Sequence, residues 1–591
     1  MRQLFTLNRF FVVYKWHFLL GIVFVTGSNY FGILIPQKIR DALDLVQYKI
    51  QEYKDLPTDI KSGVYDDLGY HLFMFGLVIT GFVIIKGLLM YFMRQTIIVM
   101  SRLIEYDMRK EIYTHLQSLD QSFYRKNQTG DIMARISEDV SKVRNYLGPG
   151  VLYGINLLTL FFMTIYAMFK VDVLLSVCAL LPLPVLSISI YYVSNLINEK
   201  STLIQQQLSV LNSTAQETYS GIRVVKSYVK EEQFVDFFRI QSEEFKSRSL
   251  ALARIESYFQ PLMILLIALS TLIVVVVGGY QVFAGKLTAG NIAEFILYVN
   301  MLTWPVTSIG WIASVVQEAE ASQKRINELL IQKSDIINRN ENIYRLKGEI
   351  EFRNVSFVYP NTGIKALENV SFTVKSGEKV AIMGRTASGK TTIAELLTRM
   401  FDVTDGEILL DGMNIKDHNI SIIRDQIGYV PQDVFLFSDT IYANIAFANP
   451  TISQSDIEKY AGYASVYEDI MRLPDKFNTL VGERGVTLSG GQKQRISIAR
   501  AFIKNPEIIL LDDALSAVDT TTEQNIMSFF QKSLEHKTSF IISHRTNNLL
   551  GYDKIIVLEE GKIADSGTHE ELISKQGFYS SVYQQQMMQQ N

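Results

Sequence analysis

The sequence contains a glycine-rich segment whose spacing fits the binding of a polyphosphate. Residues 384–391 read Gly-Arg-Thr-Ala-Ser-Gly-Lys-Thr and match G-x-x-x-x-G-K-[ST]. The apolar residues 379–383 before them predict a strand, and residues 392–397 predict a helix. Backbone N–H groups and a helix N-terminus can wrap phosphates in such a loop. We predict a nucleotide site with Lys390 on the β- and γ-phosphates and Thr391 on Mg²⁺, lined by Gly384, Arg385, Thr386, Ala387, Ser388, Gly389 and Thr392.

A second apolar run ends in two carboxylates. Residues 507–511 read Glu-Ile-Ile-Leu-Leu, which is typical of a buried strand, and Asp512 and Asp513 follow. Asp512 can hold the water shell of Mg²⁺, and Asp513 can reach an attacking water. Many strands end in acidic residues, so this pair alone is a weak signal. Together with the phosphate-binding loop it becomes a strong signal for a nucleotide site with Mg²⁺ and an attacking water.

Residues 488–492, which read Leu-Ser-Gly-Gly-Gln, lie between these two elements in the chain. Serine is a good helix N-cap, and two glycines let backbone approach a phosphate closely. In this position the string resembles the signature of the ATP-binding cassette (ABC) superfamily. The resemblance implies that an ATP is clamped between the P-loop of one chain and the signature of another, which here is Ser489, Gly490, Gly491 and Gln492.

Further landmarks of the superfamily follow in order, and the resemblance assigns their roles. Tyr359 resembles the residue that stacks on adenine, Gln432 the Q-loop glutamine that touches Mg²⁺, and His544 the switch histidine at the γ-phosphate. Glu483 resembles an exporter-type contact to membrane helices, and residues 516–519 resemble the D-loop. The implied catalytic residues are Asp513, His544 and Gln432, and the implied Mg²⁺ ligands are Thr391, Gln432 and Asp512.

Two residues depart from the superfamily pattern. Ala387 stands where glycine is usual and tolerates fewer backbone conformations. Asp513 stands where the base is usually glutamate, so its oxygens retreat by ~1.5 Å. Such an aspartate often marks a slow site in a heterodimer whose partner supplies the competent one. The intact signature of this chain would then serve the partner's site, although a homodimer stays open.

The chain that positions these residues has two halves of different composition. Its 591 residues are 48% hydrophobic and 20% charged, and 57 basic against 60 acidic residues give a net charge of −3. No global basic field therefore indicates nucleic acid, and a single cysteine excludes a disulfide framework. Long apolar runs fill residues 1 to about 320, whereas residues from about 347 read as mixed α/β.

Six apolar runs near ~20 residues in length predict a helical membrane domain. They are residues 16–35, 72–93, 151–169, 173–193, 262–283 and 292–311. Residues 94–144 hold nine lysines and arginines, so we place this loop, the N-terminus and the C-terminal domain in the cytosol. The predicted organisation is an amphipathic interfacial helix at 1–15, a six-span domain at 16–320, a linker at 321–346 and a P-loop ATPase domain at 347–591.

The membrane half also resembles ABC exporters. Residues 123–140 are similar to their first cytosolic loop, and residues 217–226 to the second, which carries a coupling helix. The expected protein is a half-transporter of the bacterial inner membrane that dimerises, uses ATP and Mg²⁺, and exports a drug, lipid or peptide. Two other classes are a weakly catalytic regulatory or channel-like subunit and a soluble ABC protein acting on DNA or ribosomes. The apolar runs argue against the soluble class.

Two charged residues fall inside the apolar runs. Lys86 lies deep in the second, and such a charge indicates function by default. Facing a central cavity, it would attract an anionic headgroup, while the alternatives are a structural ion pair or a side chain snorkelling to the cytosolic side. Glu294 lies near the outer end of the sixth run, where we expect it at the interface.

Overall fold

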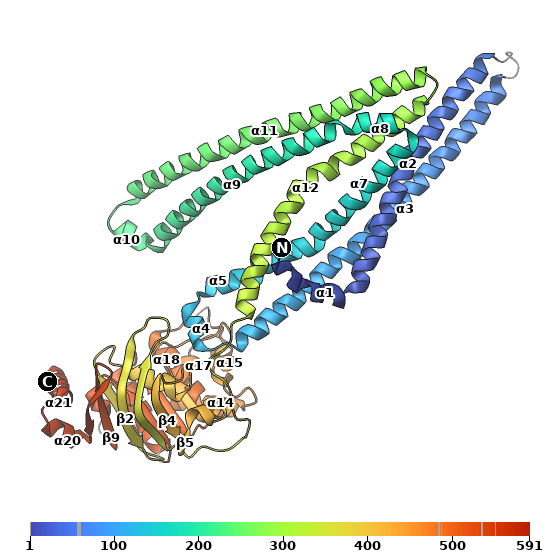
Figure 1. The fold of residues 1–591 in the computed structure, drawn as a ribbon. Helices are drawn as coiled ribbons and strands as arrows, with labels where there is room; N and C mark the ends of the chain where they lie inside the picture. Colours follow the sequence, from blue (N-terminus) through green and yellow to red (C-terminus); the bar gives the residue numbers. More distant parts are fainter. Residues whose placement is uncertain are drawn as a thin grey trace. The chain divides into compact units, whose positions relative to one another are not determined.

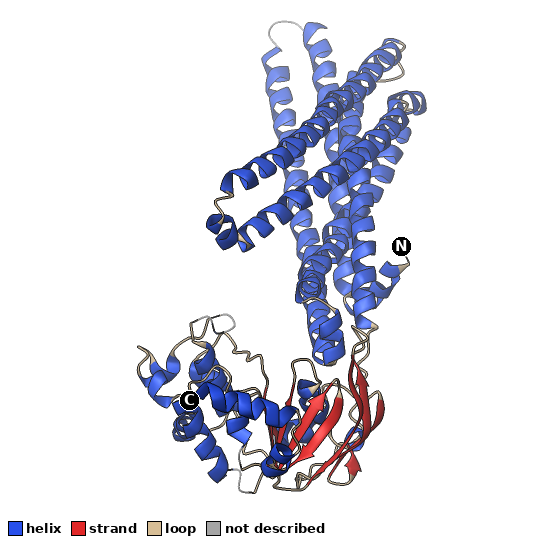
Figure 2. Ribbon diagram, turned by 90° about the vertical axis from the view of Figure 1, so that its left-hand side faces the viewer, coloured by secondary structure: helices blue, strands red, loops and turns tan. Residues whose placement is uncertain are grey.

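A computed structural model describes residues 2–55, 61–482, 485, 487–533, 536–549 and 551–590. Glu483 lies outside these residues. The chain forms two compact units, one of Met1–Gln117 with Gly130–Gln332 and the other of Ser118–Thr129 with Lys333–Asn591. Within the described residues, every strand belongs to the second unit, and the first unit is helical (Figure 2).

The apolar runs form the long helices of the first unit (Figure 1). Five helical segments among the described residues are long and apolar enough to cross a membrane. Four belong to α2 (Lys15–Asp55), α3 (Lys61–Gln117), α11 (Glu231–Phe283) and α12 (Ala289–Leu330). The fifth joins α5 (Thr129–Ala134), α6 (Val140–Asn145) and α7 (Val151–Val171) through π-helical turns at Arg135–Asp139 and Tyr146–Gly150.

The expected fourth span is divided in the structure. Residues 173–193 are shared between α8 (Val173–Leu180) and α9 (Pro182–Ser220), which are separated at Leu181. Proline lacks a backbone N–H and is tolerated in a first helical turn, which explains the new start at Pro182. The segment is apolar, and the count of six spans stays a prediction.

The N-terminal segment packs on the first unit as two short helices. Residues Gln3–Leu7 form a 3₁₀ helix, and α1 (Asn8–Val13) follows. Arg9 donates a hydrogen bond of 2.9 Å to Glu111 of α3, and the Tyr14 hydroxyl donates one of 2.7 Å to Asp107. These contacts fix the segment against the polar end of α3.

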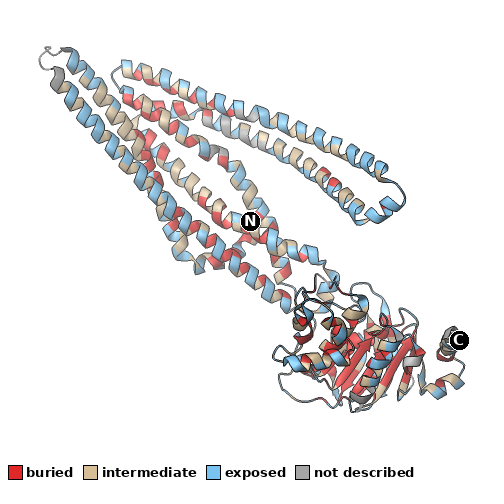
Figure 3. Ribbon diagram, turned by 180° about the vertical axis from the view of Figure 1, so that it is seen from behind, coloured by how far each residue is buried: buried red, intermediate tan, exposed pale blue. Residues whose placement is uncertain are grey.

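Helices α9 and α11 run side by side and end in a short helix, α10 (Ile222–Ser227) (Figure 1). Much of the surface of this pair is exposed (Figure 3). At the tip, Tyr219, Val224, Tyr228 and Val229 are each more than 60% exposed. An apolar tip of this kind is an uncovered surface suited to a partner.

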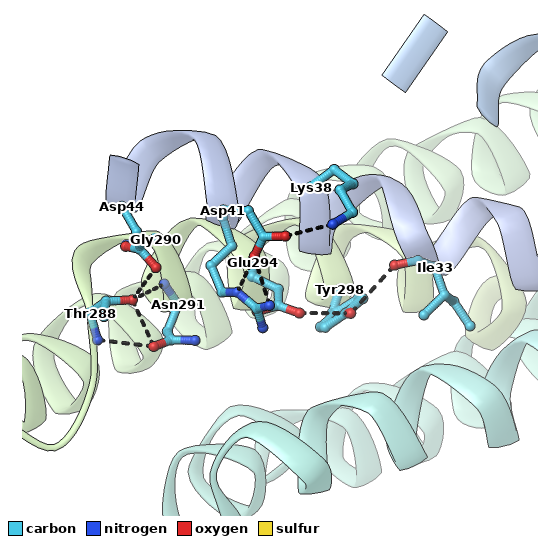
Figure 4. Close-up of polar contacts among 10 residues, drawn as sticks. Ile33, Lys38, Asp41, Asp44, Thr288, Gly290, Asn291, Glu294 and Tyr298 are labelled. Atoms are coloured by element: carbon cyan, nitrogen blue, oxygen red, sulfur yellow. Dashed lines mark hydrogen bonds and ion pairs between the residues drawn. The ribbon is translucent and has the colours of Figure 1, made fainter. Parts of the chain in front are cut away.

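A polar network joins α2 to the start of α12 (Figure 4). Glu294 is fully buried, accepts a hydrogen bond of 2.9 Å from the Tyr298 hydroxyl, and pairs with Arg40 at 3.0 Å. Asp44 accepts hydrogen bonds from the Gly290 N–H at 2.9 Å and the Thr288 hydroxyl at 2.8 Å. These contacts tie the N-terminus of α12 to α2, and Glu294 lies inside the helix packing rather than on an exposed surface.

The second unit contains two sheets. The four-stranded sheet is antiparallel in the order β2-β1-β4-β5, with β1 (Ile350–Val358), β2 (Lys365–Val374), β4 (Asp405–Leu410) and β5 (Met413–Asn414). The six-stranded sheet has the order β10-β9-β3-β8-β7-β6, with β3 (Lys379–Gly384), β6 (Ile427–Val430), β7 (Ile508–Asp512), β8 (Thr538–Ile542), β9 (Lys554–Glu559) and β10 (Lys562–Gly567). Its strands pair in parallel except β10.

Helices complete the second unit. They are α4 (Gln121–Lys126), α13 (Lys390–Leu397), α14 (Ile420–Gln426), α15 (Ile441–Ala446), α16 (Gln454–Tyr463), α17 (Tyr467–Met471), α18 (Gly490–Phe502), α19 (Thr520–Ser533), α20 (His569–Ser574) and α21 (Phe578–Gln590). Strands β7 and β8 are buried along their whole length, as expected for parallel strands covered on both faces.

The strand order explains how distant segments meet. Strands β3, β8, β7 and β6 are consecutive neighbours, so their carboxyl ends lie at one edge of the sheet. The phosphate-binding loop follows β3, Asp512 ends β7, and His544 and Gln432 come two residues after β8 and β6. Ligands of open α/β sheets bind at this edge.

Candidate functional site

The phosphate-binding loop runs from the end of β3 into α13, and glycine is required at both of its ends. Gly389 caps α13 with φ of 94°, a left-handed conformation that side chains rarely adopt. A Cβ atom there would collide with the Ala366 carbonyl oxygen, and one at Gly384 would collide with that of Leu558. The loop therefore passes against neighbouring backbone at both of its ends.

Lys390 is held inside this loop. Its Nζ atom donates to the carbonyl oxygens of Gly384 at 3.1 Å and Arg385 at 2.7 Å, and its side chain is 7% exposed. Burial lowers the pKa of Lys390, while the charges of Asp512 and Asp513 oppose this shift. The ammonium group is thus poorly hydrated and placed at the centre of the loop, where an anionic phosphate would stabilise it.

Ala387 stands where glycine is usual, and its backbone adopts the left-handed conformation that favours glycine. Its φ is 63°, which costs an L-residue with a Cβ atom roughly 1–2 kcal/mol. The loop keeps this conformation because the surrounding backbone determines it. The departure from the superfamily pattern therefore adds local strain to the phosphate-binding loop.

The carboxylates at the end of β7 have different surroundings. Asp512 is 1% exposed, and its Oδ2 atom has no hydrogen-bond partner among the described residues. Burial raises the pKa of Asp512 to about 6, despite a hydrogen bond from Thr391 that acts in the opposite direction. Asp513 has φ of 49°, and its backbone N–H donates to the Ile542 carbonyl oxygen at 3.0 Å. This contact ties the position of Asp513 to the end of β8.

The Asp512 environment fits a bound Mg²⁺ ion. A buried carboxylate oxygen without a hydrogen-bond donor is costly, and a hard cation or its water shell would satisfy it. Thr391 and Asp512 lie together, and Gln432 lines the same cleft from its exposed edge. The structure brings together the three residues that the sequence predicts as Mg²⁺ ligands.

A single cleft brings together most of the predicted nucleotide residues. It is lined by Tyr359, Thr386, Ala387, Ser388, Gly389, Lys390, Thr391, Thr392, Gln432, Asp512, Asp513 and His544. Gly384 and Arg385 are not among its lining residues but contribute the carbonyl oxygens that hold Lys390. The cleft therefore has a cationic and backbone-rich floor with carboxylates on one wall, as binding of a metal-bound polyphosphate requires.

His544 faces the carboxylate wall of this cleft. Burial lowers the pKa of His544, and the charge of Lys390 lowers it further, while Asp513 acts in the opposite direction. The His544 carbonyl oxygen accepts a hydrogen bond of 2.8 Å from the side chain of Gln586 in α21. The imidazole is thus neutral near pH 7 and held at the end of β8.

Tyr359 reaches the cleft through contacts that sequence reasoning missed. Its hydroxyl group hydrogen-bonds to Thr392 at 2.9 Å and Glu395 at 2.8 Å. The guanidinium of Arg125 in α4 lies 4.9 Å from the centre of the Tyr359 ring and pairs with Glu395. One face of the ring is therefore covered by a cation. Arg125 lies in the loop that resembles the first cytosolic loop of exporters, but that resemblance assigns it no contact with Tyr359.

The signature residues 489–492 do not line this cleft. Ser489 caps α18, and Gln492 completes a capping box with hydrogen bonds of 3.0 and 3.2 Å between the two residues. A Cβ atom at Gly491 would lie 2.7 Å from the Ala517 carbonyl oxygen, so glycine is needed there. Gln494 in turn binds Ser516 and Ala517, both at 3.1 Å, which connects the signature helix to the expected D-loop.

The apolar helices, the parallel sheet and the phosphate-binding cleft define a membrane transporter fused to a P-loop ATPase. Comparison with known proteins agrees. Residues 18–306 match the family model described as the ABC transporter transmembrane region, and residues 367–516 match the model described as ABC transporter.

The chain belongs to the ABC transporter family. It is 36% identical over 587 residues to the probable multidrug resistance ABC transporter ATP-binding/permease protein YheI of Bacillus subtilis, covering 98% of this chain and 97% of that protein. It is 35% identical to the multidrug resistance-like ATP-binding protein MdlA of Escherichia coli, covering 86% of each. The fold matches a bacterial Atm1-family ABC exporter with ATP bound, with a TM-score of 0.78 at 23% identity over 97% of this chain and 99% of that one.

These relationships confirm the predicted architecture of a helical transmembrane domain followed by an α/β ATPase domain. The protein is an integral membrane transporter of the exporter type, and its ATPase domain hydrolyses ATP to drive transport.

Proposed function

We propose that this chain is one half of a dimeric exporter that moves a hydrophobic or amphipathic substrate out of the cytosol across the bacterial inner membrane. The proposal of a dimer rests on one observation. The cleft contains the P-loop, both carboxylates and His544, whereas the signature residues 489–492 lie elsewhere on the same unit. A second chain that brings its signature to this cleft would complete the site.

The residues of the cleft divide the work of hydrolysis. Lys390 and the loop N–H groups hold the β- and γ-phosphates, and His544 donates a hydrogen bond to the γ-phosphate. Asp513 orients the attacking water and accepts its proton. Thr391, Asp512 and Gln432 would hold Mg²⁺, which neutralises phosphate charge when it is bound.

The long arm formed by α9 and α11 offers the coupling surface. Its tip helix α10 exposes Val224, while Val225 beside it is buried and fixes the helix to the arm. In this proposal α10 docks beside Gln432 of an ATPase domain, and the N-terminus, the long loops and the ATPase domain are cytosolic. Closure of two ATPase domains then moves the helices between inward- and outward-facing states.

Asp513 makes a heterodimer slightly the better interpretation. The shorter side chain keeps its oxygens farther from the attacking water, and general-base work needs contact at ~2.6–3.2 Å. A partner with a glutamate at this position would hold the faster site. The signature of this chain would then serve that site.

The test is substrate-stimulated ATP hydrolysis by the purified chain in lipid, alone and with candidate partners. If the chain is active alone, Asp513→Asn should lower turnover by about 10²–10⁴-fold and Ser489→Arg should abolish it. In a heterodimer, Asp513→Asn should change turnover little, whereas Ser489→Arg should still abolish it. Full activity of Ser489→Arg in either setting would refute the dimeric site.

A further inference from the structure

A cavity in the helical unit carries charged groups that the nucleotide site does not use. It is lined by residues of α2, α3, α7 and α12, all of which belong to one compact unit. Its lining includes Lys86 and Arg94 of α3, Asn29 of α2, Asn156 of α7 and Trp304 of α12. Because the cavity is partly open and lined by helices that carry apolar runs, a molecule can enter it from outside the helical unit.

This cavity holds two cationic side chains, Lys86 and Arg94. Among the described residues, neither Lys86 nor Arg94 forms an ion pair. The six apolar runs contain two residues of the Asp, Glu, Lys and Arg types, which are Lys86 and Glu294. Glu294 is already paired with Arg40 at 3.0 Å and accepts a hydrogen bond of 2.9 Å from the Tyr298 hydroxyl. An intramembrane cation without a counter-ion predicts an anion supplied from outside the chain.

Both cations belong to one face of α3. Lys86, Met90, Met93 and Arg94 recur at helical spacing and all line the cavity. Eight residues of α-helix separate the two charges by ~12 Å along the helix axis. The Lys86 side chain crosses towards α2, where its Nζ atom would lie 3.4 Å from a Cβ atom built at Gly32. Gly32 thus leaves the space that Lys86 occupies.

The side chain of Asn156 offers a further hydrogen-bond donor to the cavity. Asn29 donates to the Asn156 side-chain oxygen at 3.0 Å and to the Thr159 hydroxyl at 2.7 Å. This arrangement uses the oxygen of Asn156 and leaves its N–H₂ group without an acceptor among the described residues. Donors with a positive net charge select an oxyanion rather than a cation.

The rest of the lining is apolar and adaptable. It includes Met90, Met93, Met301, Leu152, Leu160 and Trp304. Tyr153 meets Trp304 edge to face with 5.2 Å between ring centroids, and both line the cavity. Methionine side chains adjust to ligands of different shape, and aromatic rings cover flat or aliphatic groups. The surface therefore suits the apolar part of an amphipathic molecule.

We propose that this cavity is a substrate site for amphipathic organic anions, with the anionic group at Lys86 and the apolar part against the methionines and Trp304. This rests on the proposed export function and names its substrate class. Arg94, at the polar end of the same helix face, receives the anion first or binds a second acidic group. A carboxylate, sulfonate or phosphate fits, and it belongs to a lipid headgroup or to a free amphipathic molecule.

The test measures binding to the full chain in phosphatidylcholine nanodiscs without nucleotide. The probes are anilinonaphthalene sulfonate and the uncharged phenylnaphthylamine, which shares its ring system and lacks the sulfonate. We expect Lys86→Gln to weaken sulfonate binding about tenfold, because a charged hydrogen bond is lost. Binding of the uncharged probe should change less than about twofold and also reports that the cavity is folded. Lys86→Arg should bind the sulfonate about as tightly as wild type. Arg94→Gln should weaken sulfonate binding less than Lys86→Gln does.

Lys170→Gln is the matched control, because it removes an exposed lysine outside the cavity. Equal affinity of wild type and Lys86→Gln for the sulfonate, or an equal loss for both probes, would overturn the proposal. Replacing part of the phosphatidylcholine with phosphatidylglycerol identifies the source. Competition seen in wild type but not in Lys86→Gln assigns the site to a lipid headgroup, and its absence assigns it to a free amphipathic anion.

The same assay separates this proposal from the transport function. Lys390→Ala removes the phosphate grip and should stop ATP-driven transport, yet it should leave sulfonate binding dependent on Lys86. If binding depends on Lys86 but no anion stimulates ATP hydrolysis by the wild type, the site stands and its role as a transport site fails.

Discussion

Asp512 should destabilise the nucleotide-free protein through its own burial. Its side chain is 1% exposed, its Oδ2 atom has no partner among the described residues, and its pKa is raised from 3.8 to about 6. A carboxyl with a raised pKa binds its proton more tightly in the folded state. Above about pH 6 both states are ionised, so folding carries the full cost of burying the charge.

The size of this cost follows from the shift. A displacement of about two pKa units corresponds to about 3 kcal/mol at pH 7.5, and about half of it remains at pH 5. Below about pH 3.8 this cost disappears, because the Asp512 carboxyl is protonated in both the folded and the unfolded state. Asp512→Asn removes the charge and should stabilise the ATPase unit by up to about 3 kcal/mol at pH 7.5. For a unit of this size that raises the midpoint of thermal unfolding by about 6–12 °C.

The assay is thermal unfolding of the purified protein without Mg²⁺ or nucleotide at pH 7.5 and pH 5. We expect the difference between Asp512→Asn and wild type to shrink at the lower pH. Asp513→Asn is the control, because it makes the same charge change at a less buried neighbour. Addition of Mg²⁺ and ATP should stabilise wild type and leave Asp512→Asn much less affected. An Asp512→Asn variant whose midpoint of thermal unfolding at pH 7.5 lies below that of wild type would refute the reasoning.

Three further predictions concern other parts of the protein. Lys390→Ala should weaken nucleotide binding by about tenfold or more, measured with a fluorescent ATP analogue, because it removes the cation inside the loop; unchanged binding together with full transport would contradict the P-loop assignment. Gly221→Glu, next to α10, should leave basal ATP hydrolysis intact and remove its stimulation by substrate, and surviving stimulation would mean that coupling runs elsewhere. Arg40→Ala should lower the thermal stability of the helical unit by about 1–3 kcal/mol, because it strands buried Glu294; Glu294→Gln should cost less, since the amide still accepts the Tyr298 hydrogen bond, and the opposite ranking would contradict the burial argument.

The ATPase site could be predicted from the sequence because its parts are short local patterns. Each of three short patterns predicts its own element: the P-loop, the acidic pair and the strand before His544. The order of the parallel strands then determines which strand ends lie side by side. The positive φ of Ala387 also follows the expectation that glycine is preferred there. Predictions from such patterns hold in the folded protein, because the conformation of each segment depends on its backbone and not on the packing of distant side chains.

Contacts between distant side chains gave no such signal. The cluster of Arg125, Tyr359 and Glu395 joins three elements through a ring face and a buried acid, and no spacing rule relates these positions. Burial of Glu294 likewise depends on the position of α2 beside α12. The division of residues 173–193 before Pro182 was not predicted, although proline is favoured in the first turn of a helix.

The ATPase unit is discontinuous in the chain, and this sets an order of events during synthesis. Ser118–Thr129, which carries Arg125, belongs to the same compact unit as Lys333–Asn591 but precedes it by about 200 residues. A ribosome that adds ~5–20 residues per second needs about 10–40 s to cover that distance. During this interval the early segment has no strands to pack against, and Arg125 meets Tyr359 only after most of the membrane domain has been made. A fragment that begins at Lys333 would therefore fold with the outer face of the Tyr359 ring bare, and supplying residues 118–129 as a separate peptide would cover it.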